Sequence, residues 1–152
     1  PTAAVNDFEY MHLAIAQAQA AALRGEVPVG ALVVLEDRIL AAAGNRTITD
    51  CDPTAHAEIV ALREAAQKTG NHRLLGASIY VTVEPCAMCA GALVQARVAR
   101  LVYGADEPKG GAIRTCMQVL DAPSLNHRVE VVSGVLAGES VQLLQSFFSA
   151  RR

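Results

Sequence analysis

The sequence predicts an α/β fold, a single mixed five-stranded sheet flanked by helices on both faces. Amphipathic helical segments alternate with short runs rich in Val, Ile and Leu, and the connections between them are short. The middle of the chain has a β-α-β order, which requires at least two parallel strands. With 152 residues, the chain is long enough for one domain with a core of its own.

The first half of the chain is expected to form a helix, a hairpin and a second helix. Residues 8–24 have apolar positions at helical spacing and are followed by glycine. Residues 27–45 contain two β-rich runs separated by "EDR", which is typical of a hairpin. Asp52 and Pro53 have the pattern of an N-cap and first helical residue, and Gly70 that of a C-cap, so a helix is expected between them.

The second half is expected to add three strands and two helices. In chain order they are a strand at 77–83, a helix at 86–99, a strand at 100–105, a strand at 128–134 and a helix at 139–152. Between residues 106 and 127 the sequence is turn-rich and then briefly helical. The last helix should bury an apolar face made of Val141, Leu143, Leu144 and Phe147. We expect residues 1–7 to form a flexible N-terminus and residues 8–152 a single domain.

Composition and charge narrow the classes of protein. The chain is 52% hydrophobic with a mean hydropathy of +0.27, yet no apolar run approaches the roughly 18 residues of a membrane span. No membrane contact is therefore expected. The first residues lack a secretory signal pattern, so we expect a cytoplasmic protein with reduced cysteines. The net charge of −2 gives no global basic surface of the kind that many nucleic-acid binders show.

The stretch "EPCAMC", residues 84–89, places two thiols three positions apart where a strand ends and a helix begins. Cys86 and Cys89 fall on one helical turn and can point at a single ion. The helix start also favours thiolate, because its free N–H groups and dipole stabilise an anion. Three uses fit this spacing: a structural zinc site, a redox pair and a catalytic metal site.

A partner for these thiols lies upstream in "HAE". His56 and Glu58 open the second expected helix, and both can serve one site if a metal lies off the helix end. His56, Cys86 and Cys89 would give three ligands to one Zn²⁺ per chain and leave its fourth position for water. Glu58 is then available as a base beside that water.

The other uses need different surroundings. Taken alone, His56 would more often be an ordinary helix-start histidine and Glu58 an acid that complements the helix dipole. A redox pair needs a thioredoxin-like setting and no upstream H-x-E motif. A structural zinc site needs a fourth protein ligand, for which the candidates are Cys51, Cys116, His72 and His127. Both motifs together, each opening a helix, favour the catalytic zinc site.

Longer segments complete a family pattern. "PVGA", "DPTAHAEI", "IYVTVEPCAMCAGAL" and "VYGADEPKGGA" together resemble the tRNA-specific adenosine deaminases, a family of the zinc-dependent cytidine/deoxycytidylate deaminase superfamily. The similarity runs from about residue 8 to residue 152. It implies a cytidine-deaminase-like three-layer α/β/α fold and hydrolytic deamination of adenosine to inosine at the wobble position of a tRNA anticodon loop.

The resemblance also implies residues for RNA binding and a partner. In this family an Asn after the hairpin contacts the target base, and Asn45 occupies that position. Candidate contacts to the anticodon stem-loop are Lys109, Asn126, Arg128, Phe148 and Arg151. Family members act as homodimers. Because the zinc motif determines the reaction type better than the substrate, the alternative function is a small-molecule nucleobase deaminase of guanine or cytosine type.

Overall fold

The computed structural model describes residues 2–151 and confirms the α/β class. Within this range five strands form one sheet, with bounds β1 (Gly30–Leu35), β2 (Arg38–Gly44), β3 (Ser78–Val83), β4 (Arg100–Ala105) and β5 (Glu130–Val132). Their order across the sheet is β2-β1-β3-β4-β5. β1 is antiparallel to β2 and β3, whereas β3, β4 and β5 run parallel, so the predicted mixed sheet is confirmed.

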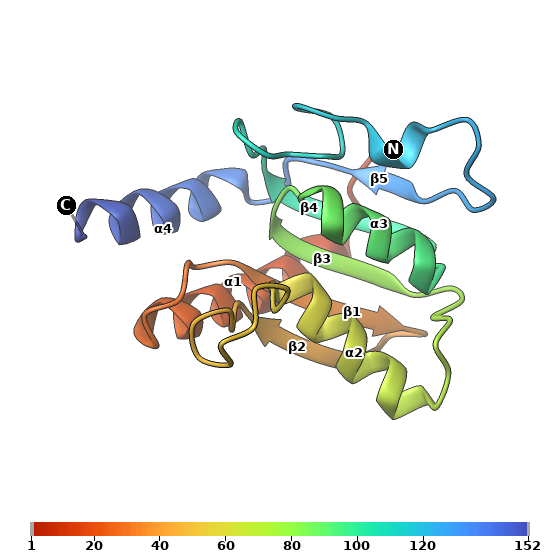
Figure 1. The fold of residues 1–152 in the computed structure, drawn as a ribbon, viewed down its shortest axis with the longest axis horizontal. Coiled ribbons are helices and arrows are strands. Elements are labelled where there is room, and N and C mark those ends of the chain that lie inside the picture. The colour runs from red at the N-terminus through yellow and green to blue at the C-terminus, as the bar shows by residue number, and fades with distance from the viewer. Residues whose placement is uncertain (1, 152) are drawn as a thin grey trace.

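Helices cover both faces of the sheet and create three layers. They are α1 (Val5–Leu23), α2 (Ala57–Thr69), α3 (Ala87–Ala96) and α4 (Ala137–Ser149), with a short 3₁₀ turn η1 (Val119–Asp121). α2 and α3 pack side by side on one face, and α1 and α4 contribute to the core on the other (Figure 1). Successive side chains of β3 point to opposite faces of the sheet. Ile79 belongs to the core under α2 and α3, and Tyr80 belongs to the core under α1. None of the helices within residues 2–151 is long and apolar enough to cross a bilayer.

The turn between β1 and β2 is tighter than "EDR" suggested. Glu36 and Asp37 alone form it, with φ of 51° and 61°, and Arg38 already belongs to β2. Two consecutive residues with positive φ match the twist of a two-residue hairpin.

Both predicted helix starts in the first half are wrong by a few residues. α1 begins at Val5, because the Asp7 carboxylate accepts the Ala4 backbone N–H at 2.7 Å and satisfies a donor that precedes the helix. α2 begins at Ala57, with His56 at its N-cap. The Asp52 carboxylate instead accepts the N–H and hydroxyl of Thr54 at 2.8 and 2.7 Å, which closes a separate turn.

Of the two predicted helix ends, that of α2 is confirmed and that of α3 is wrong. Gly70 caps α2 with φ +69°, as predicted. α3 ends at Ala96 rather than residue 99, because Arg97 adopts the left-handed conformation with φ +61°.

The buried face predicted for the last helix is partly wrong. Phe147 is buried, Leu143 and Leu144 are half-buried, and Val141 is 39% exposed. α4 projects beyond the end of the sheet (Figure 1), and its buried residues Ser140 and Phe147 lie on one face of the helix, whereas Val141 lies on another.

A polar cluster ties α1 to the sheet. The Asp7 carboxylate accepts two hydrogen bonds from the Arg100 guanidinium, at 2.7 and 2.6 Å, and one from the Tyr80 hydroxyl at 2.8 Å. Burial opposes ionisation of Asp7, but the hydrogen bonds from Arg100, Ala4 and Tyr80 outweigh it and lower the pKa of Asp7 to about 2. The cluster joins the first turn of α1 to the first residue of β4.

Candidate active site

The H-x-E and C-x-x-C motifs lie close together because α2 and α3, which cover the same face of the sheet, both begin at the end of the sheet where β3 finishes. Cys86 is the N-cap of α3, which follows the carboxyl end of β3, and Cys89 lies in the first turn of that helix. His56 is the N-cap of α2, and Glu58 is the second residue of that helix. The structure thus places two residues at the start of α2 beside two residues at the start of α3, about thirty positions later in the sequence.

The arrangement of the three candidate ligands fits Zn²⁺. Nδ1 of His56 lies 3.6 Å from Sγ of Cys86 and 3.6 Å from Sγ of Cys89, and all three atoms lie within 4.8 Å of one another. Zinc bonds of about 2.3 Å to sulfur and about 2.0 Å to nitrogen, meeting at a tetrahedral angle, put those two atoms about 3.5 Å apart, close to the distances seen here. The single lone pair of a neutral Nδ1 accepts only one hydrogen bond, so a shared ion explains both equal distances better.

A fourth protein ligand is not found in the part of the chain that the structure describes. The cluster of possible ligands there contains His56, Cys86 and Cys89 alone. Cys51 and Cys116 are exposed, and His127 Nε2 is 2.7 Å from the Val98 carbonyl. Three protein ligands leave one tetrahedral position open, which is the arrangement of catalytic rather than structural zinc.

The electrostatics of the cluster suit this role. The hydrogen bond with Cys89, followed by that with His56, lowers the pKa of the Cys86 thiol to about 3, whereas the hydrogen bond with Cys86 and burial raise the pKa of the Cys89 thiol. A metal ion that binds both sulfurs must therefore displace a proton from Cys89. Glu58 is only 4% exposed, and burial raises the pKa of its carboxyl group. A carboxyl group with a raised pKa is a stronger base than an ordinary carboxylate, which suits a group that accepts a proton and returns it.

A pocket of about 150 Å³ opens beside the cluster. In addition to His56 and Cys86, its walls are formed by Val29, Asn45, Glu58, Val83, Glu84 and Glu107. Asn45 is held there because its side-chain oxygen accepts the backbone N–H of Ala57 at 2.9 Å. No acceptor for the NH₂ group of that amide is found among residues 2–151, so this group can donate to a molecule in the pocket.

Comparison with known proteins identifies the family of this chain. A family model for MafB19-like deaminases matches residues 5–152. The tRNA-specific adenosine deaminase of Agrobacterium fabrum (strain C58) is 46% identical over 143 residues, which are 94% of this chain and 94% of that protein. This chain belongs to the tRNA-specific adenosine deaminase family.

Solved structures confirm the three-layer deaminase fold of this tRNA-specific adenosine deaminase family member. A structure from a study of A-to-I editing by tRNA:A34 deaminases at the wobble position has a TM-score of 0.87 and 46% identity, covering 90% of this chain and 99% of that one. The guanine deaminase of Nitrosomonas europaea has a TM-score of 0.82 at 24% identity, covering 97% of this chain and 86% of that one. The fold alone therefore does not determine which base is deaminated.

Three of the candidate RNA contacts are exposed in two segments. Lys109 lies in the loop after β4, where its backbone N–H donates to Oε1 of Glu107 at 2.9 Å. Phe148 is 48% exposed near the end of α4. The Arg151 guanidinium stacks over the Phe147 ring, 3.4 Å from its centroid, and donates to the Phe147 carbonyl.

The other two candidates, Asn126 and Arg128, lie at the end of the sheet opposite the pocket. Asn126 Oδ1 accepts a hydrogen bond at 2.7 Å from Arg97, which caps the end of α3 farthest from Cys86. Arg128 precedes β5 and donates to the carbonyls of Leu120, Ala122 and Pro123. Within this chain neither residue reaches the pocket, and a role for them in RNA binding stays a prediction.

Two buried glutamates, Glu26 and the pocket residue Glu84, were not predicted from the sequence. Glu26 is 0% exposed, and its carboxylate accepts hydrogen bonds from the N–H groups of Ile48 and Thr49 and from the hydroxyls of Thr47 and Thr49. Glu84 is 3% exposed and binds the loop after β4 in a similar way. The available signal was a glutamate directly beside an apolar segment, since glutamate is almost never fully buried unless it is partnered.

Proposed function

We propose that this protein is a zinc-dependent tRNA adenosine deaminase that converts adenosine to inosine at the wobble position of an anticodon stem-loop. The observation that carries the proposal is the three-residue ligand set, His56, Cys86 and Cys89, with the buried carboxyl group of Glu58 in the same pocket. Membership of the tRNA-specific adenosine deaminase family supports adenosine in RNA as the substrate.

The chemistry is a hydrolysis. When bound by these three residues, Zn²⁺ lowers the pKa of water toward about 7 and so supplies hydroxide at neutral pH. A C6–O bond forms and the C6–N bond breaks, so adenosine and water give inosine and ammonia. Glu58 accepts the proton of the attacking water, transfers it to the ring nitrogen next to C6 and assists departure of the amino group.

The other pocket residues would orient the base. The Asn45 amide has its oxygen engaged by Ala57, so it acts toward a bound base as a donor. The pocket volume of about 150 Å³ is small compared with an RNA loop, and the target nucleotide would therefore enter by flipping out of its stack.

RNA binding outside the pocket would depend on few charges. Lys109 and Arg151 are exposed cations on the loop after β4 and at the end of α4, and Phe148 offers an exposed ring for a base. With a net charge of −2, the chain would show a salt dependence that reflects only a few phosphate contacts. We place the enzyme in the cytoplasm, in keeping with a tRNA substrate.

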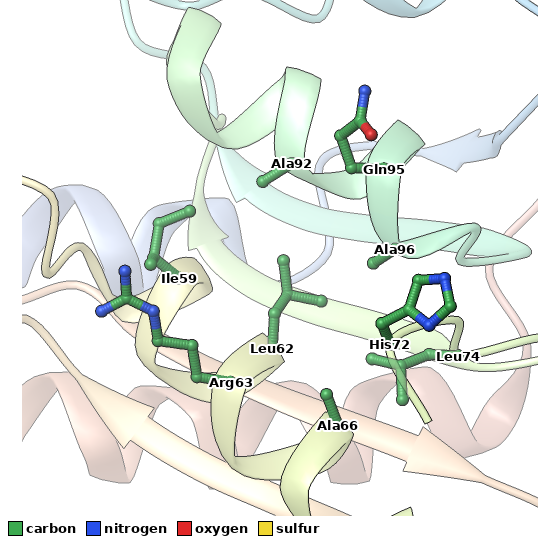
Figure 2. A pocket seen from close by; sticks show the side chains of 9 residues that line it. All are labelled: Ile59, Leu62, Arg63, Ala66, His72, Leu74, Ala92, Gln95 and Ala96. Atoms are coloured by element: carbon green, nitrogen blue, oxygen red, sulfur yellow. The ribbon is translucent and has the colours of Figure 1, made fainter. Parts of the chain in front are cut away.

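A homodimer is the assembly that we propose. A mainly apolar groove of about 430 Å³ lies between α2 and α3, with Leu62, Ala92 and Ala96 among its lining residues (Figure 2). Both helices begin at the cluster of His56 and Cys86. A second copy bound in this groove would therefore lie close to the pocket and could contribute to RNA binding.

Product analysis tests the proposed reaction. The purified protein is incubated with an anticodon stem-loop that has adenosine at the wobble position and, separately, with free adenosine, guanine, cytosine and cytidine. Mass spectrometry should detect inosine in the stem-loop alone, and the variant Glu58→Gln should form it about 10²- to 10⁴-fold more slowly. Deamination of free guanine or cytosine, with the stem-loop unchanged, would instead establish the small-molecule deaminase.

A further inference from the structure

Glu84 lies directly between the end of β3 and the ligand segment that starts at Cys86, yet its side chain is bound to another part of the chain. Its carboxylate accepts four backbone N–H groups of the segment 107–115: those of Glu107 at 3.1 Å, Ile113 at 3.0 Å, Arg114 at 2.9 Å and Thr115 at 3.1 Å. The Thr115 hydroxyl donates to the same carboxylate. The segment 107–115 is thus wrapped around one buried acid.

This carboxylate is stabilised by hydrogen bonds rather than by a cation. No ion pair in residues 2–151 includes Glu84. Hydrogen bonds from neutral donors to an ionised carboxylate are roughly twice as strong as bonds between neutral groups. Because the donors occupy both oxygens and the side chain is 3% exposed, Glu84 is not free to exchange protons with a substrate.

The segment is also shaped to fit the carboxylate. A Cβ at Gly111 would lie 2.6 Å from Oε2 of Glu84, so no side chain can be accommodated there without moving the segment or the acid. The neighbouring Gly110 has open space at the same point, with nothing within 4 Å. The close approach is therefore specific to Gly111.

The segment matters because it forms one wall of the pocket. Glu107 starts it and lines the pocket together with Asn45 and Glu58. Ala112, in its middle, donates its N–H to the carbonyl of Pro85 at 2.9 Å, next to the ligand Cys86. A movement of the segment would change the shape of the pocket, whereas His56, Cys86 and Cys89 are carried by the starts of α2 and α3 and not by this segment.

We infer that Glu84 is a positioning residue, which holds the segment 107–115 in the shape that binds the substrate base and does not itself take part in the reaction. The inference rests on the proposed deaminase function and adds a determinant of substrate binding to it. It predicts that disturbing the contact weakens substrate binding more than it slows the chemical step.

Two variants disturb the contact from its two sides, and one neighbour serves as the control. Glu84→Gln replaces one acceptor oxygen with an NH₂ group that faces N–H donors, and Gly111→Ala inserts a methyl group against an unchanged acid. For both we expect KM for the stem-loop to rise about tenfold with kcat within about threefold of wild type, the pattern of lost uniform binding. Gly110→Ala should raise KM much less than Gly111→Ala does, because a Cβ at Gly110 meets nothing within 4 Å.

Two readouts are independent of activity. Zinc content should stay near one ion per chain in all three variants. Hydrogen exchange at the amides of Ile113, Arg114 and Thr115 should become faster in Glu84→Gln and Gly111→Ala than in Gly110→Ala. Exchange is measured on the zinc-loaded proteins at a temperature where each is fully folded.

The outcomes separate this inference from the proposed function. An unchanged KM, a fall in kcat alone, a loss of zinc, or an equal effect of Gly110→Ala and Gly111→Ala would each overturn the positioning role. If wild type deaminates free guanine or cytosine instead of the stem-loop, the RNA assignment fails. The same four proteins are then compared on that base, so the role of Glu84 is still decided.

Discussion

The side-chain oxygen of Asn45 accepts the backbone N–H of Ala57 at 2.9 Å. This hydrogen bond joins the end of the β1–β2 hairpin to the first residue of α2, which stands between His56 and Glu58. The bond also determines the orientation of the amide, because Ala57 needs an acceptor. Asn45 is thereby presented to the pocket as a donor, with its position set by the same helix start that carries the candidate ligand and the candidate base.

Replacing Asn45 with aspartate tests this donor role. The variant Asn45→Asp keeps an oxygen for Ala57 but loses the NH₂ group and adds a charge to the pocket. We expect kcat/KM for the stem-loop to fall about a hundredfold. The reason is that a hydrogen-bond partner of the substrate left unpaired by the missing NH₂ group costs on the order of 1–3 kcal/mol. Asn71→Asp is the matched control, because Asn71 also accepts a backbone N–H through its side-chain oxygen but is exposed. Equal activity of the two variants would contradict the role of Asn45.

The metal content of cysteine variants tests the ligand set. Cys51→Ser and Cys116→Ser should retain close to one zinc per chain, because both residues are exposed and outside the ligand cluster. Cys86→Ser, Cys89→Ser and His56→Ala should lose most of it. The measurement is elemental analysis after dialysis. Loss of zinc from either of the first two variants would mean that the ligand set is wrong.

Glu58→Gln separates metal binding from catalysis. The variant should keep its zinc, since Glu58 is not a ligand, and its turnover should fall about 10²- to 10⁴-fold, the usual contribution of a general acid–base group. Glu64→Gln changes an exposed glutamate of the same helix and should leave both quantities unchanged. Turnover that persists in Glu58→Gln would show that another group transfers the proton.

Acid sensitivity should include a contribution from Asp7. The folded-state pKa of Asp7 is about 2 against an ordinary value of 3.8, so its stabilisation is present above the ordinary value and is lost as pH falls toward 2. The shift corresponds to about 2 kcal/mol of unfolding free energy. Asp7→Asn should therefore be less stable than wild type near neutral pH, and the gap should narrow in acid.

Denaturant titrations of both proteins across that pH range measure the gap. Zinc release in acid affects wild type and Asp7→Asn alike, so the difference between their free energies of unfolding isolates the carboxylate. A gap that stays constant with pH would refute the contribution of the ion pair with Arg100.

The groove between α2 and α3 should be the dimer surface. Ala92→Arg places a long cation in the groove and should convert the dimer to a monomer, because an unpaired charge in an apolar interface is costly. Gln67→Arg adds the same charge to an exposed position of α2 outside the groove and should remain dimeric. Sedimentation analysis of the two variants and wild type is the measurement. A dimeric Ala92→Arg would place the interface elsewhere.

The sequence by itself determined the fold class, the strand at 100–105 and the three candidate metal ligands that the structure brings together. These rest on local patterns, namely hydrophobic periodicity and short motifs at helix starts, because neighbours along the chain decide helix and strand formation. His56, Glu58, Cys86 and Cys89 could be named for the same reason, since each motif lies within a single helical turn.

Only the tertiary structure decided the features that join distant parts of the chain. Asp52 turned out to bind Thr54 rather than cap α2, and Val141 is exposed because α4 buries the face that carries Ser140 and Phe147. The partners of Glu26 and Glu84 lie more than twenty positions away along the chain. The physical reason is that a buried carboxylate needs donors but does not specify where in the sequence they lie. Packing of the sheet and helices brings those donors to it.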